Sequence, residues 1–148
     1  MDYESLKQTM IKISMISKLH REVFEKNISS LGVHQSQHRL LMYLSRCKET
    51  PRQKDISEHF KVSPAAIAVS LKKLEKGGFI EKSSGTDARA NKIIITDKGK
   101  DIVKASRNMF KDVDKNVFSS IDEDELKSLN ATLDMIIRNL EDISEGEI

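Results

Sequence analysis

Residues 53–78 contain the feature that most constrains the fold, two short helical segments separated by a very short connection. The first segment, QKDISEHF, spans about two helical turns and places Ile56 and Phe60 on one side. The second begins after KVS with Ser63 as an N-cap and Pro64 at the first helical position, and it stops at paired glycines. Its inward stripe is predicted to consist of Ile67, Leu71 and Leu74. Two short helices joined by a turn of three or four residues form a helix-turn-helix, so the sequence predicts this motif.

The segments on either side of this motif make the prediction more specific. QSQHRLLMYLSRCK predicts a preceding helix with Leu40, Leu41 and Leu44 directed inward, and Pro51 then disfavours helix at the residue before it. FIEKSS and NKIIIT are short β-rich runs, and the GTDARA loop between them contains turn-forming residues. A hairpin directly after a helix-turn-helix is a wing. The sequence therefore predicts a winged helix-turn-helix over residues 32–99.

Long amphipathic helices are expected at both ends of the chain. In the first, apolar residues recur every three or four positions, namely Tyr3, Leu6, Met10, Ile13, Ile16, Leu19 and Val23. Thr96 is expected to cap a helix over residues 97–118. Asp122 and Glu125 suggest a capping box before a last apolar stripe over residues 126–143.

The terminal helices present more apolar surface than a small monomer covers. We therefore expect them to pack together and to form a dimerisation region from residues 1–31 and 100–148. The predicted fold class is mainly α with a small β-hairpin, a winged helix-turn-helix domain joined to helices that form the dimerisation domain.

Charge divides the chain in the same way. Residues 32–99 carry 13 basic and 7 acidic side chains, a balance of +6, whereas residues 100–148 carry 7 and 12, a balance of −5. A basic segment is suited to neutralising phosphates. No apolar run approaches the ~18 residues of a membrane span, and the polar start MDYESLKQTM does not resemble a secretion signal. These features predict a cytoplasmic protein with no membrane partner.

The chain resembles the MarR (multiple antibiotic resistance regulator) family of bacterial and archaeal transcription regulators over essentially its whole length. The residues that carry the resemblance are VSPAAIAVSLKKLEKGGFIEK at 62–82 and TDARANKIIITDKG at 86–99, in which Asp87-Ala88-Arg89 matches the Asp-x-Arg signature of the wing. The resemblance implies a homodimer with interlocked terminal helices. Each winged domain would meet one half of a palindromic site on double-stranded DNA. A regulator of this kind, most simply a repressor, is released by a small-molecule effector.

The second helix of the motif is predicted to read DNA. A major groove admits a helix only where the backbone and short side chains approach the base edges, and alanine or valine methyls can meet thymine methyls. Ser63 and the helix N-terminus would hold a phosphate. The alternative is an alanine-rich helix that is simply a good helix. The expected contacts of this motif are Gln53, Ser63, Pro64, Ala65, Ala68, Val69, Lys72 and Lys73.

The wing is predicted to contribute further contacts. Arg89, at the hairpin tip, suits a narrow A·T-rich minor groove with its concentrated negative potential. Asp87 would repel DNA, so we expect it to pair with an arginine and to fix the loop. A plain turn aspartate and a solvated arginine are the alternative. Lys92 and Arg52 are further phosphate candidates, together with the two lysines of the recognition helix.

The effector site is less defined by the sequence. The resemblance implies an effector cleft between the winged domain and the dimer helices. His38, on the same side as Leu41, is expected to line it with His20 and Arg39, where a small aromatic anion would bind. His34 and His38, at i and i+4, also have a spacing that could hold zinc, but no cysteine or acidic cluster completes such a site. No cofactor is expected.

The single cysteine and the enzyme classes complete the sequence-based picture. Cys47, placed at the end of the second helix, leaves a redox-responsive regulator of the same fold open, with a spectator thiol as the alternative. Glycine-rich phosphate loops, nucleophile elbows and metal motifs are not found in the sequence, so an enzyme is not expected. The competitor from another class is a winged-helix adaptor whose basic face binds an acidic protein.

Overall fold

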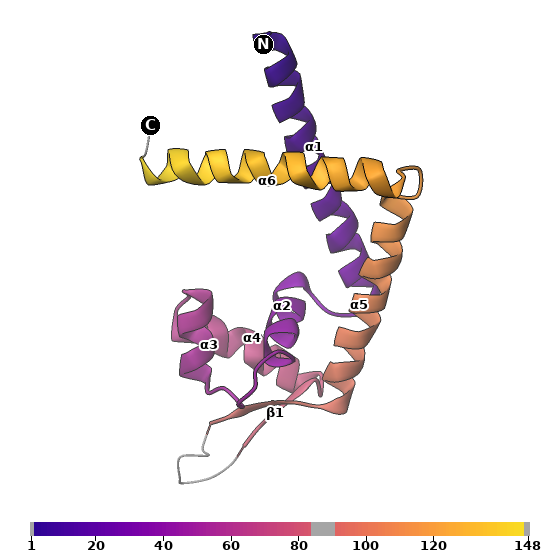
Figure 1. Cartoon of the computed structure of the whole chain (residues 1–148). Coiled ribbons are helices and arrows are strands. Elements are labelled where there is room, and N and C mark those ends of the chain that lie inside the picture. The colour runs from indigo at the N-terminus through magenta and orange to yellow at the C-terminus, as the bar shows by residue number, and fades with distance from the viewer. Residues whose placement is uncertain (1, 84–90, 147–148) are drawn as a thin grey trace. The chain divides into compact units, whose positions relative to one another are not determined.

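The computed structural model describes residues 2–83 and 91–146, which form six helices and two strands within those ranges. The elements in chain order are α1 (Tyr3–Ser30), α2 (Gln35–Leu44), α3 (Gln53–Phe60), α4 (Pro64–Lys76), β1 (Ile80–Lys82), β2 (Ile93–Ile95), α5 (Asp97–Val117) and α6 (Glu123–Glu145) (Figure 1). The chain forms two compact units, one ending at Phe110 and one beginning at Lys111. The mainly helical fold with a small hairpin confirms the predicted class.

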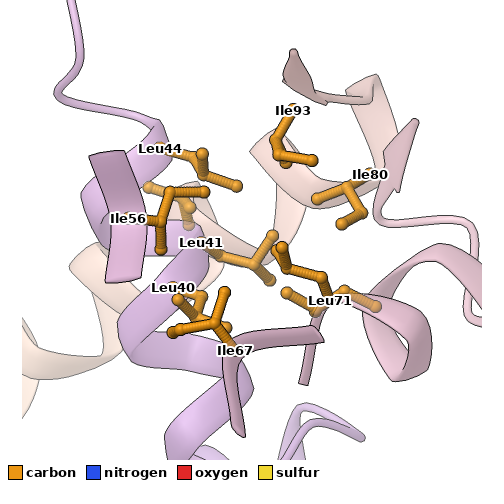
Figure 2. Close-up of a cluster of buried hydrophobic side chains, with 10 residues drawn as sticks. Leu40, Leu41, Leu44, Ile56, Ile67, Leu71, Ile80 and Ile93 are labelled. Carbon is orange, nitrogen blue, oxygen red and sulfur yellow. The ribbon is translucent and has the colours of Figure 1, made fainter. Parts of the chain in front are cut away.

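The core of the first unit is formed by the predicted helix-turn-helix and the helices and strands next to it. Figure 2 shows aliphatic side chains from α2, α3, α4 and both strands directed toward one another. The buried members of this core are Leu40, Leu41, Leu44, Ile56, Ile67, Leu71, Leu74, Ile80, Ile93 and Val103. All the positions that the sequence placed inward on α2 and α4 are among them. Fully burying each such side chain stabilises the fold by about 1.5–3 kcal/mol.

The wing has a third component that the sequence did not indicate. β1 and β2 pair antiparallel, with Ile80 opposite Ile95, as expected for a hairpin. In addition, Arg52 and Lys92 form an isolated antiparallel bridge, and the Ile93 amide donates to the Pro51 carbonyl at 2.9 Å. The connection between α2 and α3 therefore runs along the wing and holds its base. The hairpin tip, which contains Asp87 and Arg89, lies outside the described residues.

Two glycines near the wing occupy positions where a larger residue would be strained or would not fit. Gly78 has a φ of +75°, a left-handed conformation that turns the chain from α4 into β1. At Gly99, near the start of α5, a Cβ would overlap the Phe79 carbonyl oxygen and lie 2.8 Å from Cγ1 of Ile95. Glycine therefore lets α5 approach the strands closely. Thr96 precedes α5, and its hydroxyl accepts from the Gly99 amide at 3.2 Å, which confirms the predicted cap.

Helix α1 is longer than its predicted stripe and is largely uncovered. It runs to Ser30, and only Ile28 on it is buried. Its apolar side chains are exposed, with Ile16 at 67% and Leu19 at 51%. Most of the predicted stripe therefore faces outward.

In the second unit, the capping box predicted at the start of α6 is present. Asp122 accepts from the amides of Asp124 and Glu125 at 2.9 Å, and its own amide donates to the Glu125 carboxylate at 3.1 Å. No residue of α6 is buried.

Candidate nucleic-acid interface

The turn between α3 and α4 is held by local hydrogen bonds. Lys61 ends α3 in a left-handed conformation with φ of 52°. Ser57, buried on α3, donates its hydroxyl to the Val62 carbonyl at 2.7 Å, and the Ser57 carbonyl accepts from the Val62 amide at 3.2 Å. These bonds satisfy the backbone of the turn and fix where α4 begins. The predicted three-residue connection is confirmed.

The N-terminus of α4 is exposed and capped. Ser63 accepts a hydrogen bond from the Ala66 amide at 3.2 Å, and Pro64 occupies the first helical position. Both residues are exposed. A helix start of this kind presents amide groups and a positive dipole end to solvent, which suits a phosphate oxygen.

The two faces of α4 have opposite character. Ile67, Leu71 and Leu74 are buried and fix the helix on the core (Figure 2). The outward face carries an exposed Ala65, a half-buried Ala68 and a Val69 that is 58% exposed, followed by the exposed cations Lys72 and Lys73. The outer face therefore has small apolar side chains near the N-terminus and positive charge farther along.

The side chain of Gln53, a predicted DNA contact, does not extend freely into solvent. It is half-buried at the start of α3, and its Nε2 donates to the Pro64 carbonyl at 3.3 Å. The side chain therefore connects the two helices of the motif at the N-terminal end of α4. The sequence placed Gln53 near this end but carried no sign of the contact.

The remaining predicted phosphate contacts lie at the base of the wing. Lys92 is half-buried and Arg52 is exposed, and the β-bridge between them brings the two cations side by side. The Arg52 amide donates to the Asp55 carboxylate at 2.8 Å, which caps α3. This pairing across 40 residues of sequence requires the folded wing, so no local pattern indicated it. Asp87 and Arg89 are not among the described residues.

A pocket of about 730 Å³ lies in the same unit, and its walls are rich in aromatic side chains. Phe24 of α1 and Phe110 of α5 stack with ring centroids 4.4 Å apart and an interplanar angle of 3°. Tyr43 of α2 lies 4.2 Å from His59 of α3, again between ring centroids. The residues that line the pocket are Phe24, His38, Arg39, Met42, Tyr43, Arg46, Cys47, His59, Phe60 and Phe110.

The structure brings together two of the three predicted effector residues. His38 and Arg39 line the pocket, and the Arg39 guanidinium carbon lies 5.5 Å from the centroid of the Phe60 ring. His20 is exposed on α1 and is not among the lining residues. The aromatic walls were missed because their residues are far apart in the sequence and carry no shared motif.

His38 is buried, and its surroundings favour the neutral imidazole. Its side chain is 2% exposed, and neither ring nitrogen has a hydrogen-bond partner among the described residues. Burial lowers the pKa of His38 below its ordinary value of 6.5, because the charged imidazolium loses its hydration.

The other residues considered as sensors have structural roles. His34 is the N-cap of α2 rather than a helical residue, and its Nδ1 accepts from the Ser36 amide at 3.2 Å. Within residues 2–83 and 91–146, no group of three or more histidine, cysteine or acidic side chains is placed to hold a metal.

Cys47 lies beyond the helix at whose end the sequence placed it. Helix α2 stops at Leu44, and the half-buried Cys47 thiol donates to the Tyr43 carbonyl at 3.4 Å from the loop that follows. Burial raises the pKa of Tyr43, and its interaction with the Cys47 side chain and the charge of Asp55 raise it further. The thiol thus contacts the pocket wall.

No helix in the described part of the chain is both long and apolar enough to cross a membrane. The fold, together with the small side chains and lysines on the outer face of α4, defines a winged helix-turn-helix protein of the DNA-binding class.

Comparison with known proteins places the chain within that class. Residues 31–90 match the model of the MarR family. The HTH-type transcriptional regulator BilQ of Clostridioides difficile (strain CD3) is 26% identical over 137 residues, which cover 92% of this chain and 90% of BilQ. A MarR family transcriptional regulator from Clostridium acetobutylicum has a similar structure, with a TM-score of 0.77, 26% identity and coverage of 89% of this chain and 98% of its own. The chain is therefore similar to MarR family transcription regulators, and the family model itself covers residues 31–90.

A structure with DNA is also similar in fold. A mutant of MepR from Staphylococcus aureus, solved bound to an oligodeoxyribonucleotide, has a TM-score of 0.72 and 22% identity. The alignment covers 95% of this chain and 99% of MepR. At this identity the likeness concerns the fold.

Proposed function

We propose that the protein is a homodimeric repressor that binds a palindromic operator and is released by a small aromatic anion. The observation that carries the DNA-binding part is the outer face of α4, where exposed small residues follow a capped, solvent-facing N-terminus. The opposite face is locked in the core, so the helix is presented as a rigid element. The fold shared with MepR bound to an oligodeoxyribonucleotide supports the same assignment.

The roles proposed along this surface follow from side-chain size and charge. Ser63 and the first amides of α4 bind a phosphate oxygen, while Ala65 and Ala68 let the backbone approach the base edges. Val69 offers methyl groups to thymine. Because Gln53 is hydrogen-bonded to the first turn of α4, we assign it mainly to holding that turn in position. The cations proposed to contact the DNA backbone are Arg52, Lys72, Lys73 and Lys92.

The wing completes the proposed interface. Arg89 enters a narrow minor groove, where the negative potential is greatest, and Asp87 fixes the loop that carries it. The bridge between Arg52 and Lys92 supports this role, because it anchors the base of the wing on the connection that leads into α3. In this arrangement residues 32–99 form the DNA-binding domain.

Dimerisation is proposed to use residues 1–31 and 100–148. The exposed apolar side chains of α1 and α6 support this assignment, because large apolar surfaces mark interaction sites. A second copy of the chain would cover them through a two-fold interface, in which the same patch meets itself. Two copies then present two α4 helices to the two halves of a palindrome. Because a DNA-binding regulator acts where the chromosome lies, we assign the protein to the cytoplasm.

The effector is proposed to bind in the aromatic pocket. Its rings suit a planar ligand, and Arg39 and Arg46 supply positive charge for a carboxylate. The pocket is lined from α1, α2, α3 and α5, so a ligand there contacts both the winged domain and the proposed dimer helices. Release of DNA requires that the ligand bind the DNA-incompetent spacing of the wings more tightly than the competent one.

The DNA-binding part is tested by selecting bound sequences from random duplexes and then measuring affinity as a function of salt. A protein that contacts several phosphates gives a logarithmic plot with a slope of about −0.9 per phosphate. Replacing Lys72 by alanine should reduce that slope by roughly 1 while leaving the selected sequence unchanged. The same replacement of Lys127, an α6 lysine ion-paired with Glu123 at 2.9 Å, is the control. A salt-independent affinity and no enriched sequence would favour the adaptor for an acidic protein instead.

A further inference from the structure

The buried ring of His38 is the most unusual polar group in the described part of the chain. Neither nitrogen has a hydrogen-bond partner, although the side chain is 2% exposed. Phe24 and Phe110 hold the ring edge-to-face, with centroid distances of 5.8 and 6.0 Å and interplanar angles of 75° and 72°. Buried polar atoms in proteins are almost always hydrogen-bonded, so an imidazole of this kind marks a position where a polar or charged partner is favoured.

The permanently charged side chains that line the pocket, Arg39 and Arg46, are both positive. From α1 and α5, the rings of Phe24 and Phe110 face His38 and carry no charge. No aspartate or glutamate is among the described residues that line the pocket. The groups lining it that can titrate or carry charge are Arg39 and Tyr43 on α2, Arg46 and Cys47 after it, and His59 on α3.

This environment opposes a proton on His38 in the free protein. Burial removes the hydration that would stabilise an imidazolium, and it lowers the pKa of His38. Two arginines line the same pocket, so a third positive charge would be added where no lining carboxylate offsets it. A ligand that brings a negative charge offsets part of this positive charge and makes a proton on His38 less costly.

We propose that an aromatic carboxylate bound in this pocket draws one proton from solvent onto His38, so that ligand binding is coupled to proton uptake. This inference rests on the proposed effector pocket and assigns His38 a role within it. One N–H bond forms on the imidazole, an acid of the solvent or buffer loses the proton, and the ligand remains a carboxylate. The bound state then contains an imidazolium near the carboxylate in place of a neutral ring near the same anion.

The coupling does not require a direct hydrogen bond in the conformation described. Charge attraction acts over several ångströms, and near protein it is less screened than in bulk water. In addition, the terminal torsion of a histidine has a broad energy profile, so the ring can turn a nitrogen toward the pocket without leaving α2.

Isothermal titration calorimetry of the DNA-free protein with 2-naphthoate tests this coupling. Titrations at one pH in two buffers of different ionisation enthalpy report how many protons are taken up. We expect uptake of a fraction of a proton per site at pH 7, and affinity that rises by up to about tenfold per pH unit from pH 8 to pH 6. The uncharged 2-naphthamide should bind without proton uptake.

Variants identify which group receives the proton. His38→Phe keeps an aromatic ring but cannot titrate, so it should abolish both the uptake and the pH dependence. His34→Asn removes an exposed imidazole and keeps an N-cap residue, so it should retain both. If His59→Phe abolished the uptake and His38→Phe did not, the proton would belong to His59 and the proposal would be wrong.

The wild-type protein provides a readout that does not depend on a variant folding correctly. In NMR titrations of the imidazole carbon-bound protons, the pKa of His38 should rise when 2-naphthoate saturates the pocket. Binding of 2-naphthoate with no proton uptake and no such rise would overturn this inference while leaving the effector pocket in place. Failure of 2-naphthoate to bind, in a protein that still binds its selected DNA, would overturn the effector class and this inference together.

Discussion

Helices α4 and α1 each leave one face uncovered, and the two faces differ in the size of their side chains. On α4 the uncovered positions near the N-terminus are alanines and one valine, followed by lysines. On α1 they are large apolar residues such as Ile16 and Leu19. A face of small residues admits the close approach of a groove, whereas a stripe of large apolar residues gains most by being covered by another apolar surface. The two helices are therefore suited to different partners.

The inner faces of the same helices sharpen this contrast. Helix α4 buries Ile67, Leu71 and Leu74 within its own chain, so its position is set before any partner binds. Helix α1 buries only Ile28. The recognition helix is thus a fixed element of a monomer core, while α1 gains most of its packing from assembly if the proposed dimer is correct.

The largest effect is expected from charging the stripe of α1. Ile16→Glu combined with Leu19→Glu places carboxylates in the proposed dimer interface, where each lacks a partner. Dissociation should become favoured by about 4 kcal/mol or more, roughly a thousandfold in the dissociation constant. Light scattering and sedimentation at micromolar concentration would detect the monomer. Lys18→Glu places a carboxylate on the opposite side of α1 and should leave a dimer; a double variant that remained a dimer would exclude α1 from the interface.

The inner and outer faces of α4 should differ strongly in their contribution to stability. Leu71→Ala removes a fully buried side chain and should lower the free energy of unfolding by about 2–5 kcal/mol. Val69→Ala, two residues earlier on the exposed face, should change it by no more than about 0.5 kcal/mol. Chemical denaturation followed by circular dichroism measures both. Equal losses would contradict the assignment of Val69 to a surface left open for DNA.

The wing should contribute less to operator binding than the helix it flanks. Arg89→Ala is expected to weaken binding by about 1–3 kcal/mol, with the greatest loss on sites that have A·T-rich flanks. Fluorescence anisotropy on duplexes that differ only in their flanks checks this dependence. A loss that is independent of the flanking sequence would place Arg89 on a phosphate rather than in a narrow groove.

The stability of the folded protein should depend on pH through His38. Because the folded state has the lower pKa, the unfolded chain binds the proton first as the pH falls through 6.5, and stability is lost below that pH. The melting temperature of the wild type should therefore fall more between pH 7.5 and pH 5.5 than that of His38→Phe. Calorimetric melting at both pH values decides this, and parallel falls in the two proteins would show that His38 is not the group responsible.

The elements that the sequence predicted well are those defined by local chemistry. Ser63, Pro64 and Asp122 identify helix starts through hydrogen bonds or ring geometry that involve only the next few residues, and all three were confirmed. The inward positions of α2 and α4 were predicted for a similar reason, since the helical repeat alone decides which side chains share a face.

The features that the sequence missed depend on contacts between distant segments. The bridge from Arg52 to Lys92 and the stacking of Phe24 on Phe110 join residues that only the folded chain brings together. The hydrogen bond from the Gln53 amide to a carbonyl on the next helix is a contact of the same kind. Short-range patterns carry no information about such pairs, so the aromatic pocket could not be outlined beforehand. Of the polar residues that line it, only His38 and Arg39 were predicted effector contacts, and His38 was placed through its side of α2.

One measurement tests the central claim that α4 and α1 serve separate partners. The affinity of a selected operator duplex is measured at fixed salt for the wild type, Ala68→Glu and Ala105→Glu, with light scattering on the same samples. Ala105 is exposed on α5, outside the apolar stripes of α1 and α6 that are proposed to form the dimer interface, so the control introduces the same charge away from α4. We predict that Ala68→Glu abolishes specific binding while all three proteins remain folded dimers, and that Ala105→Glu binds like the wild type. Wild-type operator affinity in Ala68→Glu would contradict the assignment of α4 to DNA.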